Sequence, residues 1–160
     1  MSAASSATPA TEVAVRPARL DDAAAIVDFN HRLALESEQK KLDHETLVKG
    51  VDSILRDPRL GLYFVAVAGN RIVGQMAVTE EWSDWRNGRL WWLQSVFVDP
   101  DWRGKGVFRL LLNKVSARGR EAGVIGLRLY VERHNERAQG TYSRSGFGDA
   151  GYVVMEHIPL

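Results

Sequence analysis

The stretch that decides the fold is Leu93–Phe108, with the sequence LQSVFVDPDWRGKGVF. An apolar run ends at Asp99-Pro100, and a short glycine-containing loop then leads into an apolar-periodic segment that ends near Ala122. Glycine lets the backbone turn sharply and approach a ligand closely. The first turn of a helix offers free N–H groups and the positive end of the helix dipole. The stretch therefore predicts a strand, an anion-binding loop and a helix, and phosphate is the usual anion at such a site.

Two well-known phosphate loops do not fit this sequence. A P-loop needs four residues between its first glycine and a Gly-Lys-Ser/Thr, and the stretch has no such spacing. A dinucleotide-binding fingerprint needs a third glycine where Arg109 stands. A pyrophosphate cradle of a third kind remains, to which Arg103 and Lys105 add positive charge. A plain strand-to-helix turn with exposed basic residues stays open as the alternative.

The flanking sequence predicts a layered domain of alternating strands and helices. We expect strands at 13–16, 62–67, 72–79, 90–98, 126–131 and 152–158. The stretch 80–89 is expected to be a strand end plus a loop. Helices are expected to open at Asp21 and at Asp43, and then to span 104–122 and 135–145. Because 90–98 is apolar except for Gln94 and Ser95, we expect it to be a central strand. The order β-α-α-β-β-β-α-β-α-β indicates an α/β (α+β layered) fold with a mixed sheet.

Composition limits the class of protein. The chain has 160 residues, 45% of them hydrophobic, and no cysteine, which favours one domain over 13–160 and excludes a disulfide framework, a thiolate metal site and a cysteine nucleophile. We expect no metal site. The net charge of +1 predicts neither a nucleic-acid partner nor a membrane partner. Residues 1–12 are expected to be a disordered or added tail without a signal sequence, so we expect a cytoplasmic protein.

Two motifs resemble the GNAT acetyltransferases. The family's cofactor loop, Arg/Gln-x-x-Gly-x-Gly/Ala, is similar to Arg103-Gly104-Lys105-Gly106-Val107-Phe108, although Phe108 replaces the last small residue. A family pattern, Asn-x-x-Ala-x-x-x-Tyr-x-x-x-Gly-Phe, matches Asn135, Ala138, Tyr142, Gly146 and Phe147. The resemblance covers residues 13 to 158. The segment Glu81–Arg86 further resembles an unassigned bacterial-type subgroup.

The resemblance implies an N-acetyltransferase with a largely antiparallel sheet. It would move an acetyl group from acetyl-CoA to a primary amine by direct attack in a ternary complex. Tyr142 would be the general acid to the thiolate, unless it is a core tyrosine, and Asn135 would bond the cofactor arm or cap its helix. The other cofactor-binding residues implied are Val96, Phe97, Val98, Arg103, Gly104, Lys105, Gly106, Val107, Phe108 and Ala138. A non-catalytic acyl-CoA-binding sensor, or a partner-binding module on the same fold, stays open as the alternative.

The general base and the acceptor are not fixed by the sequence. Glu81, at the end of a strand beside the predicted cleft, is the catalytic candidate. The alternatives are Glu36 and Glu38, at the end of the first helix, and a water held by Gln94 or Ser95. Acceptor contacts are expected from Glu36, Trp82, Trp85, Gln94 and Ser95. The two tryptophans suit a cationic amine, the core or a dimer surface. The expected partner is a small-molecule or peptide amine, and a homodimer stays open because dimers are common in this family.

Overall fold

Five strands form one mixed sheet in the order β1-β2-β3-β4-β5. The computed structural model describes residues 12–160, so the expected tail, except for Glu12, lies outside the described residues. All neighbouring strands are antiparallel except β4 and β5, which are parallel. The strands are β1 (Val13–Pro17), β2 (Leu62–Ala68), β3 (Arg71–Ser83), β4 (Gly88–Val98) and β5 (Val124–Arg128). The helices are α1 (Ala23–Glu38), α2 (His44–Arg56), α3 (Val107–Glu121) and α4 (Glu136–Arg144), with short 3₁₀ turns at Leu20–Asp22 and Pro100–Trp102.

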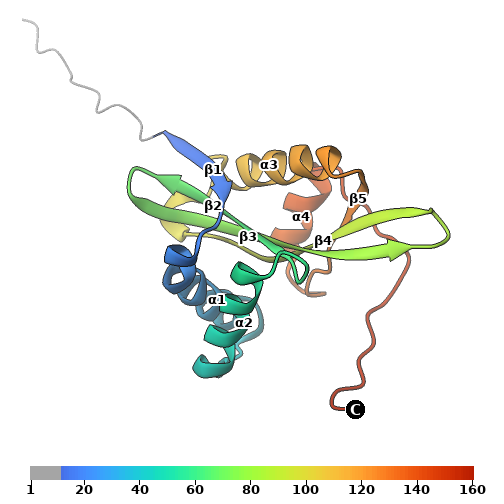
Figure 1. Ribbon diagram of the computed structural model, residues 1–160, viewed down its shortest axis with the longest axis horizontal. Coiled ribbons are helices and arrows are strands. Elements are labelled where there is room, and N and C mark those ends of the chain that lie inside the picture. The colour runs from blue at the N-terminus through green and yellow to red at the C-terminus, as the bar shows by residue number, and fades with distance from the viewer. Residues whose placement is uncertain (1–11) are drawn as a thin grey trace, which may run out of the picture.

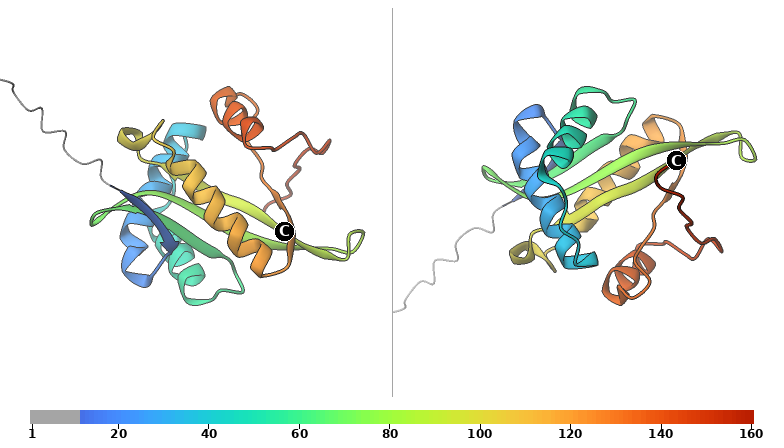
Figure 2. Two further views of the ribbon diagram at one scale, coloured as in Figure 1. Left: turned by 90° about the horizontal axis from the view of Figure 1, so that it is seen from above. Right: turned by 90° about the horizontal axis from the view of Figure 1, so that it is seen from below.

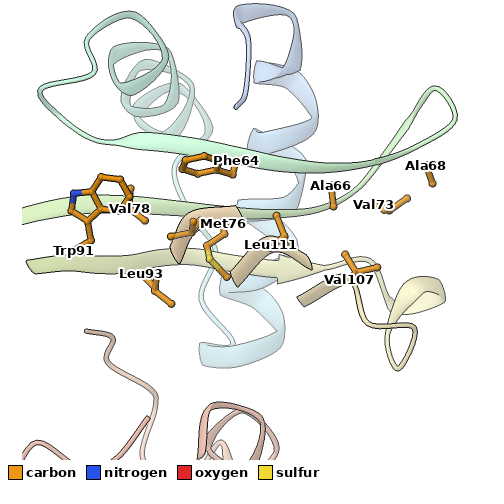
Figure 3. Close-up of a cluster of buried hydrophobic side chains, with 11 residues drawn as sticks. Phe64, Ala66, Ala68, Val73, Met76, Val78, Trp91, Leu93, Val107 and Leu111 are labelled. Atoms are coloured by element: carbon orange, nitrogen blue, oxygen red, sulfur yellow. The ribbon is translucent and has the colours of Figure 1, made fainter. Parts of the chain in front are cut away.

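The sheet has a helical layer on each face (Figures 1 and 2), which confirms the expected layered α/β class. Alternation along β2 separates two cores, as the period of a strand requires. Phe64 and Ala66 join the cluster under α3, which also contains Leu111 (Figure 3). Val115 belongs to the same cluster. Tyr63 and Val65 join the cluster under α1 and α2, with Ile26, Val27 and Val51.

The helices begin where the chain offers an acceptor or a positive-φ glycine. The Asp43 carboxylate accepts a hydrogen bond from the Thr46 N–H at 2.8 Å, and α2 begins at the next residue. The helix expected from Gly104 instead begins at Val107, because Gly104 (φ +74°) and Gly106 (φ +81°) are left-handed and extend the loop. None of the described helices is long and apolar enough to cross a membrane.

The β3–β4 hairpin is longer than expected. The stretch 80–89 was expected to be a strand end plus a loop, but the strands continue almost to the turn, since Glu81 pairs with Leu90 and Trp82 with Arg89. The turn is confined to 84–87, where Asn87 takes a left-handed φ of 47°. Polar residues fit this extension because its tip projects beyond the helical layers (Figure 1) and residues 84–87 are exposed.

The expected closing strand at 152–158 is wrong. The sheet ends at β5, and residues 152–160 are exposed and in no helix or strand. A β pattern becomes a strand only where a neighbouring edge supplies hydrogen-bond partners. No hydrogen bond joins these residues to the rest of the described chain. Strand β5 also differs from the expectation at its ends, since it occupies 124–128 rather than 126–131.

Candidate active site

A β-bulge interrupts β4 three residues before its end. Gln75 pairs with Phe97 and Ala77 pairs with Gln94, so two residues of β4, Ser95 and Val96, lie opposite Met76 alone. Ser95 takes a φ of 49°, a conformation that is uncommon for a residue with a side chain. Bulges re-aim the backbone and are over-represented next to active sites. The bulge therefore interrupts the β3–β4 ladder at Ser95 and Val96 and makes this part of β4 a candidate ligand-binding site.

Three neutral polar side chains, those of Asn30, Tyr63 and Gln75, hold the bulge at Ser95. Gln75 is fully buried, and its Nε2 donates to Asn30 Oδ1 at 3.0 Å and to the Ser95 carbonyl at 3.1 Å. Asn30 Nδ2 donates to the Tyr63 hydroxyl at 3.1 Å, and that hydroxyl lies 3.4 Å from Ser95 Oγ. Gln75 Oε1 is buried without a hydrogen-bond partner in the described structure. Such groups are costly to bury, so the network fixes Ser95 at the expense of a fully satisfied core.

Replacing Gln75 by Met should lower the free energy of unfolding by about 2 kcal/mol. The isosteric side chain removes the donor to the Ser95 carbonyl and to Asn30, and each buried acceptor left unpaired costs ~1–3 kcal/mol. Urea unfolding at pH 7 measures the change. Met76→Leu, a volume-conserving change at the adjacent buried position, is the control and should cost less than ~1.5 kcal/mol. Equal losses in the two variants would contradict the proposed support of the bulge.

Beyond the bulge, β4 has an unpaired edge. Its parallel pairing with β5 stops where Trp92 faces Arg128, so within residues 12–160 no ladder continues along Leu93–Val98 on that side. Tyr130 lies across the divergence, where its hydroxyl donates to Gln94 Oε1 at 2.9 Å and its ring contacts that of Trp92. Backbone groups that lack a ladder partner seek another. This edge can therefore form hydrogen bonds to an extended ligand.

The loop after β4 is shaped to receive an anion. No hydrogen bond within the described chain uses the N–H of Gly104, Lys105 or Gly106. A Cβ placed on either glycine would meet no atom within 4 Å, so the space in front of the loop is open. Gly106 is the residue before α3, and the helix dipole adds to these free donors.

Arg103 ties this loop to the end of α1. Its Nε donates to the Val98 carbonyl at 2.9 Å, and its two terminal nitrogens donate to the Glu36 carboxylate at 2.6 and 2.8 Å. These hydrogen bonds hold the pKa of Glu36 below its ordinary value. Lys105 Nζ lies 5.1 Å from the centre of the Trp102 ring. Glu36, expected on the acceptor side, thus contacts the side chain expected to bind the cofactor's phosphates.

Tyr142 lies beside the start of α3. Its ring makes edge contacts with Phe108 at 5.7 Å and with Phe147 at 6.0 Å. Because it contacts Tyr142, Phe108 points towards α4, and it packs against the buried cluster under α3. Burial raises the pKa of the Tyr142 phenol. Asn135 caps α4, since its Oδ1 accepts from the Ala138 N–H at 3.0 Å.

Glu81 lies nearer the hairpin than the bulge. It accepts a hydrogen bond from Trp92 Nε1 at 2.5 Å and two from Arg128 at 3.0 and 3.1 Å. A cavity of about 220 Å³ adjoins it, lined also by Trp82, Ser83, Asp84, Trp85, Arg86 and Tyr152. Glu81, Trp82 and Trp85, three of the side chains expected at the active site, thus lie together at the hairpin end of β4.

Sequence reasoning missed the residues beneath and across the bulge, namely Asn30, Tyr63, Gln75, Arg128 and Tyr130. One signal was available, because Gln75 is a polar residue within an apolar strand, and a buried polar group is informative. The others become neighbours only through folding.

A larger cavity of about 760 Å³ lies between α1 and the β2–β3 turn. Charged side chains that line it pair with one another, as in the contact of Arg71 with Asp99 at 2.8 Å.

These features define an α/β domain whose unpaired strand edge and open loop at a helix start could accept an extended, phosphate-bearing ligand. Residues 24–147 match the model of the Acetyltransferase (GNAT) family. The chain belongs to this family, which uses acetyl-CoA.

Solved and curated relatives agree with this membership. The chain is similar to a possible acetyltransferase from Clostridium difficile 630, with 40% identity, a TM-score of 0.85, and coverage of 92% of this chain and 98% of that one. It is 49% identical over 60 residues to a mycothiol acetyltransferase from Propionibacterium freudenreichii subsp. shermanii, covering 35% of this chain and 19% of that protein. It is 32% identical over 81 residues to a thialysine N-epsilon-acetyltransferase from Bos taurus, covering 51% and 47%. The matches thus span less than half the length of these curated relatives.

Proposed function

We propose that the chain is an N-acetyltransferase that moves the acetyl group of acetyl-CoA to a primary amine by direct attack within a ternary complex. The observation that carries this proposal is the loop from Gly104 to Gly106, with its unbonded N–H groups directly after the bulged strand. Family membership supports acetyl-CoA as the cofactor. The name of the bovine relative, which specifies an ε-nitrogen, supports an amine acceptor.

The residues present fit a cofactor that carries a pyrophosphate. The open space at Gly104 and Gly106 lets the backbone approach the phosphates, and Arg103 and Lys105 supply positive charge. The unpaired edge at Val96–Val98 would bond the pantetheine arm. Asn135 Nδ2 makes no hydrogen bond to residues 12–160 and could donate to the same arm, since the helix cap uses only Oδ1. Ala138 lies one turn further along α4.

Acetyl-CoA, when bound, supplies a thioester carbonyl that is open to attack by an amine. A backbone N–H at the bulge would donate to the carbonyl oxygen as it gains negative charge, which is worth about 3 kcal/mol. The Tyr142 phenol would give its proton to the sulfur as the carbon–sulfur bond breaks. Its raised pKa keeps that proton in place at neutral pH.

Glu81 and a water held by Gln94 or Ser95 are the candidates for the general base beside the bulged strand. Glu81 has the required chemistry, but its oxygens already accept hydrogen bonds from Trp92 and Arg128. Gln94 and Ser95 lie nearer the bulge, and each also has a partner, since Tyr130 donates to Gln94 and Tyr63 to Ser95. The position of Trp82 and Trp85 on the hairpin beside Tyr152 favours an interface role over an acceptor pocket for these two residues.

One observation favours the alternative of a binder without turnover. Both carboxylates expected in the site, Glu36 and Glu81, are paired with arginines. A protein that binds acetyl-CoA but lacks a usable base would leave the thioester intact. The two functions share the cofactor and differ only in the release of a thiol.

Calorimetric titration with acetyl-CoA, with NAD and ATP as controls, tests the proposal. Micromolar binding that is specific to acetyl-CoA is expected. A thiol reagent then follows coenzyme A release with a panel of primary amines, and the chain adds no background because it has no cysteine. Binding without release for any amine would support the binder, whereas no binding, or equal binding of all three nucleotides, would refute both functions.

Arg103→Ala and Glu36→Gln should change acetyl-CoA affinity in opposite directions. Loss of the guanidinium removes a charged hydrogen bond worth about 1.5–3 kcal/mol, so the Kd should rise by about tenfold or more. Glu36→Gln frees Arg103 from its carboxylate partner and removes a negative charge near the phosphates, so the Kd should fall severalfold. Calorimetry gives both values. If Glu36→Gln weakens binding instead, Glu36 positions Arg103 rather than competing for it.

A further inference from the structure

The cavity of about 760 Å³ between α1 and the β2–β3 turn is separate from the proposed active site. None of the residues that line it is among those proposed to bind acetyl-CoA or the acceptor. Its volume lies within the range of small-molecule sites, roughly 300–1,000 Å³. Three arginines and four aspartates line it, together with the apolar side chains of Ala25, Phe29, Val67 and Ile72. The cavity thus offers charges of both signs beside an apolar surface.

Two of these aspartates are buried and already paired. Asp22 accepts hydrogen bonds from Arg16 at 2.7 and 3.0 Å. Asp99 Oδ2 accepts from Arg71 at 2.8 Å, and Asp99 Oδ1 accepts from the Asp101 N–H at 3.1 Å. Because both carboxylates have partners, they hold the arginines in the wall of the cavity and leave ligand binding to other groups.

Asp28 and Arg32 form a much looser pair. Asp28 Oδ2 lies 3.5 Å from Arg32 Nη1, and Asp99 Oδ2 lies at the same distance from that nitrogen, longer than the ~2.7–3.2 Å of an ordinary N–H···O bond. The guanidinium is held mainly by the rings of Phe29 and Phe97, whose centres lie 5.4 and 5.1 Å from it. Within residues 12–160, no side-chain hydrogen bond uses Nε or Nη2 of Arg32. Donors and a carboxylate therefore stand side by side with little between them to satisfy either.

This arrangement matches the charged end of an α-amino acid. The ammonium and the carboxylate of an amino acid are joined through one carbon, so they require an anionic and a cationic group that lie next to each other, as Asp28 and Arg32 do. Arg71 lines the same cavity, and within residues 12–160 its side chain uses only Nη2, on Asp99. Its Nε and Nη1 remain for a second carboxylate oxygen, since a guanidinium suits planar, two-point recognition of that group.

We propose that this cavity binds a free α-amino acid with an apolar side chain. The carboxylate would accept hydrogen bonds from Arg32 and Arg71, and the ammonium would donate to Asp28. The aliphatic side chain would pack against Val67 and Ile72 in the lining. The amino acid is a ligand of this second site, and its binding does not depend on acetyl transfer.

Calorimetry with three ligands of one shape tests the proposal in the absence of acetyl-CoA. L-Leucine carries both charged groups, isopentylamine lacks the carboxylate, and isocaproate lacks the ammonium. L-Leucine should bind the native chain with a submillimolar Kd. Each analogue should bind at least about tenfold more weakly, because each loses charged hydrogen bonds at one end. The absence of saturable leucine binding, or equal affinities for the three ligands, would overturn the proposal.

Two variants and a matched control locate the site. Asp28→Asn removes the partner of the ammonium and Arg71→Gln a partner of the carboxylate, so each should raise the Kd for leucine by about tenfold or more. Asp52→Asn should leave it unchanged, because Asp52 is also an exposed aspartate paired with an arginine four residues along its helix, Arg56, but does not line the cavity. All three positions are exposed, so the variants should fold.

Thermal unfolding supplies a second measurement on the same proteins. A ligand that binds only the folded chain raises Tm, so leucine should raise Tm of the native chain and of Asp52→Asn more than that of Asp28→Asn or Arg71→Gln. If leucine affinity and the rise in Tm are unchanged in both cavity variants, the amino acid binds elsewhere and the proposed site is wrong.

Discussion

Replacing Tyr142 by Phe should lower kcat with an amine acceptor by about 100-fold, the lower range for loss of a positioned general acid. The Michaelis constant for acetyl-CoA should change little, because the phenylalanine ring keeps the edge contacts with Phe108 and Phe147. Steady-state kinetics that follow the released thiol separate the two parameters. Equal activity of the variant and the native enzyme would remove Tyr142 as the acid.

The pH profile adds a second measurement on Tyr142. Burial raises the pKa of its phenol, and a general acid works only while it is protonated. The native kcat should therefore stay level through the mildly alkaline range and fall only above the ordinary tyrosine pKa of about 10. The Phe variant should lack this fall. Tyr130→Phe is the matched control, since it removes a hydroxyl from the same edge of β4 and should change kcat by less than about tenfold.

The sequence was sufficient wherever the signal was local. The cap at Asp43, the cap at Asn135 and the order of strand, glycine loop and helix after Val98 depend on residues within a few positions of one another. In each case the side chain or the glycine itself imposes the backbone conformation. The order of elements up to α4 followed from these signals.

The contacts that shape the site were beyond the reach of the sequence. The bidentate contact of Arg103 with Glu36 joins residues 67 positions apart in the sequence. The hydrogen bond from Gln75 to Asn30 joins residues 45 positions apart. The sequence around one residue of such a pair gives no information about which distant residue it will contact. The prediction of a strand at 152–158 was wrong for a related reason. The alternation of this segment is typical of a strand, but pairing also requires a neighbouring edge, and the pattern does not specify that edge.

Gly106→Ala should weaken acetyl-CoA binding by at least about tenfold, whereas Gly123→Ala should leave it unchanged. The two glycines flank α3 with nearly the same backbone conformation, φ +81° and φ +74°, and a Cβ on either would meet no atom within 4 Å. Both variants should therefore lose a similar ~1–2 kcal/mol of folding free energy, the cost of a left-handed residue with a Cβ, as urea unfolding would show. Only at Gly106 does the added methyl stand where the phosphates are proposed to bind, and calorimetry with acetyl-CoA measures the difference. Equal affinities in the two variants would mean that the loss at Gly106 is backbone strain alone, and the cofactor's phosphates would have to lie elsewhere.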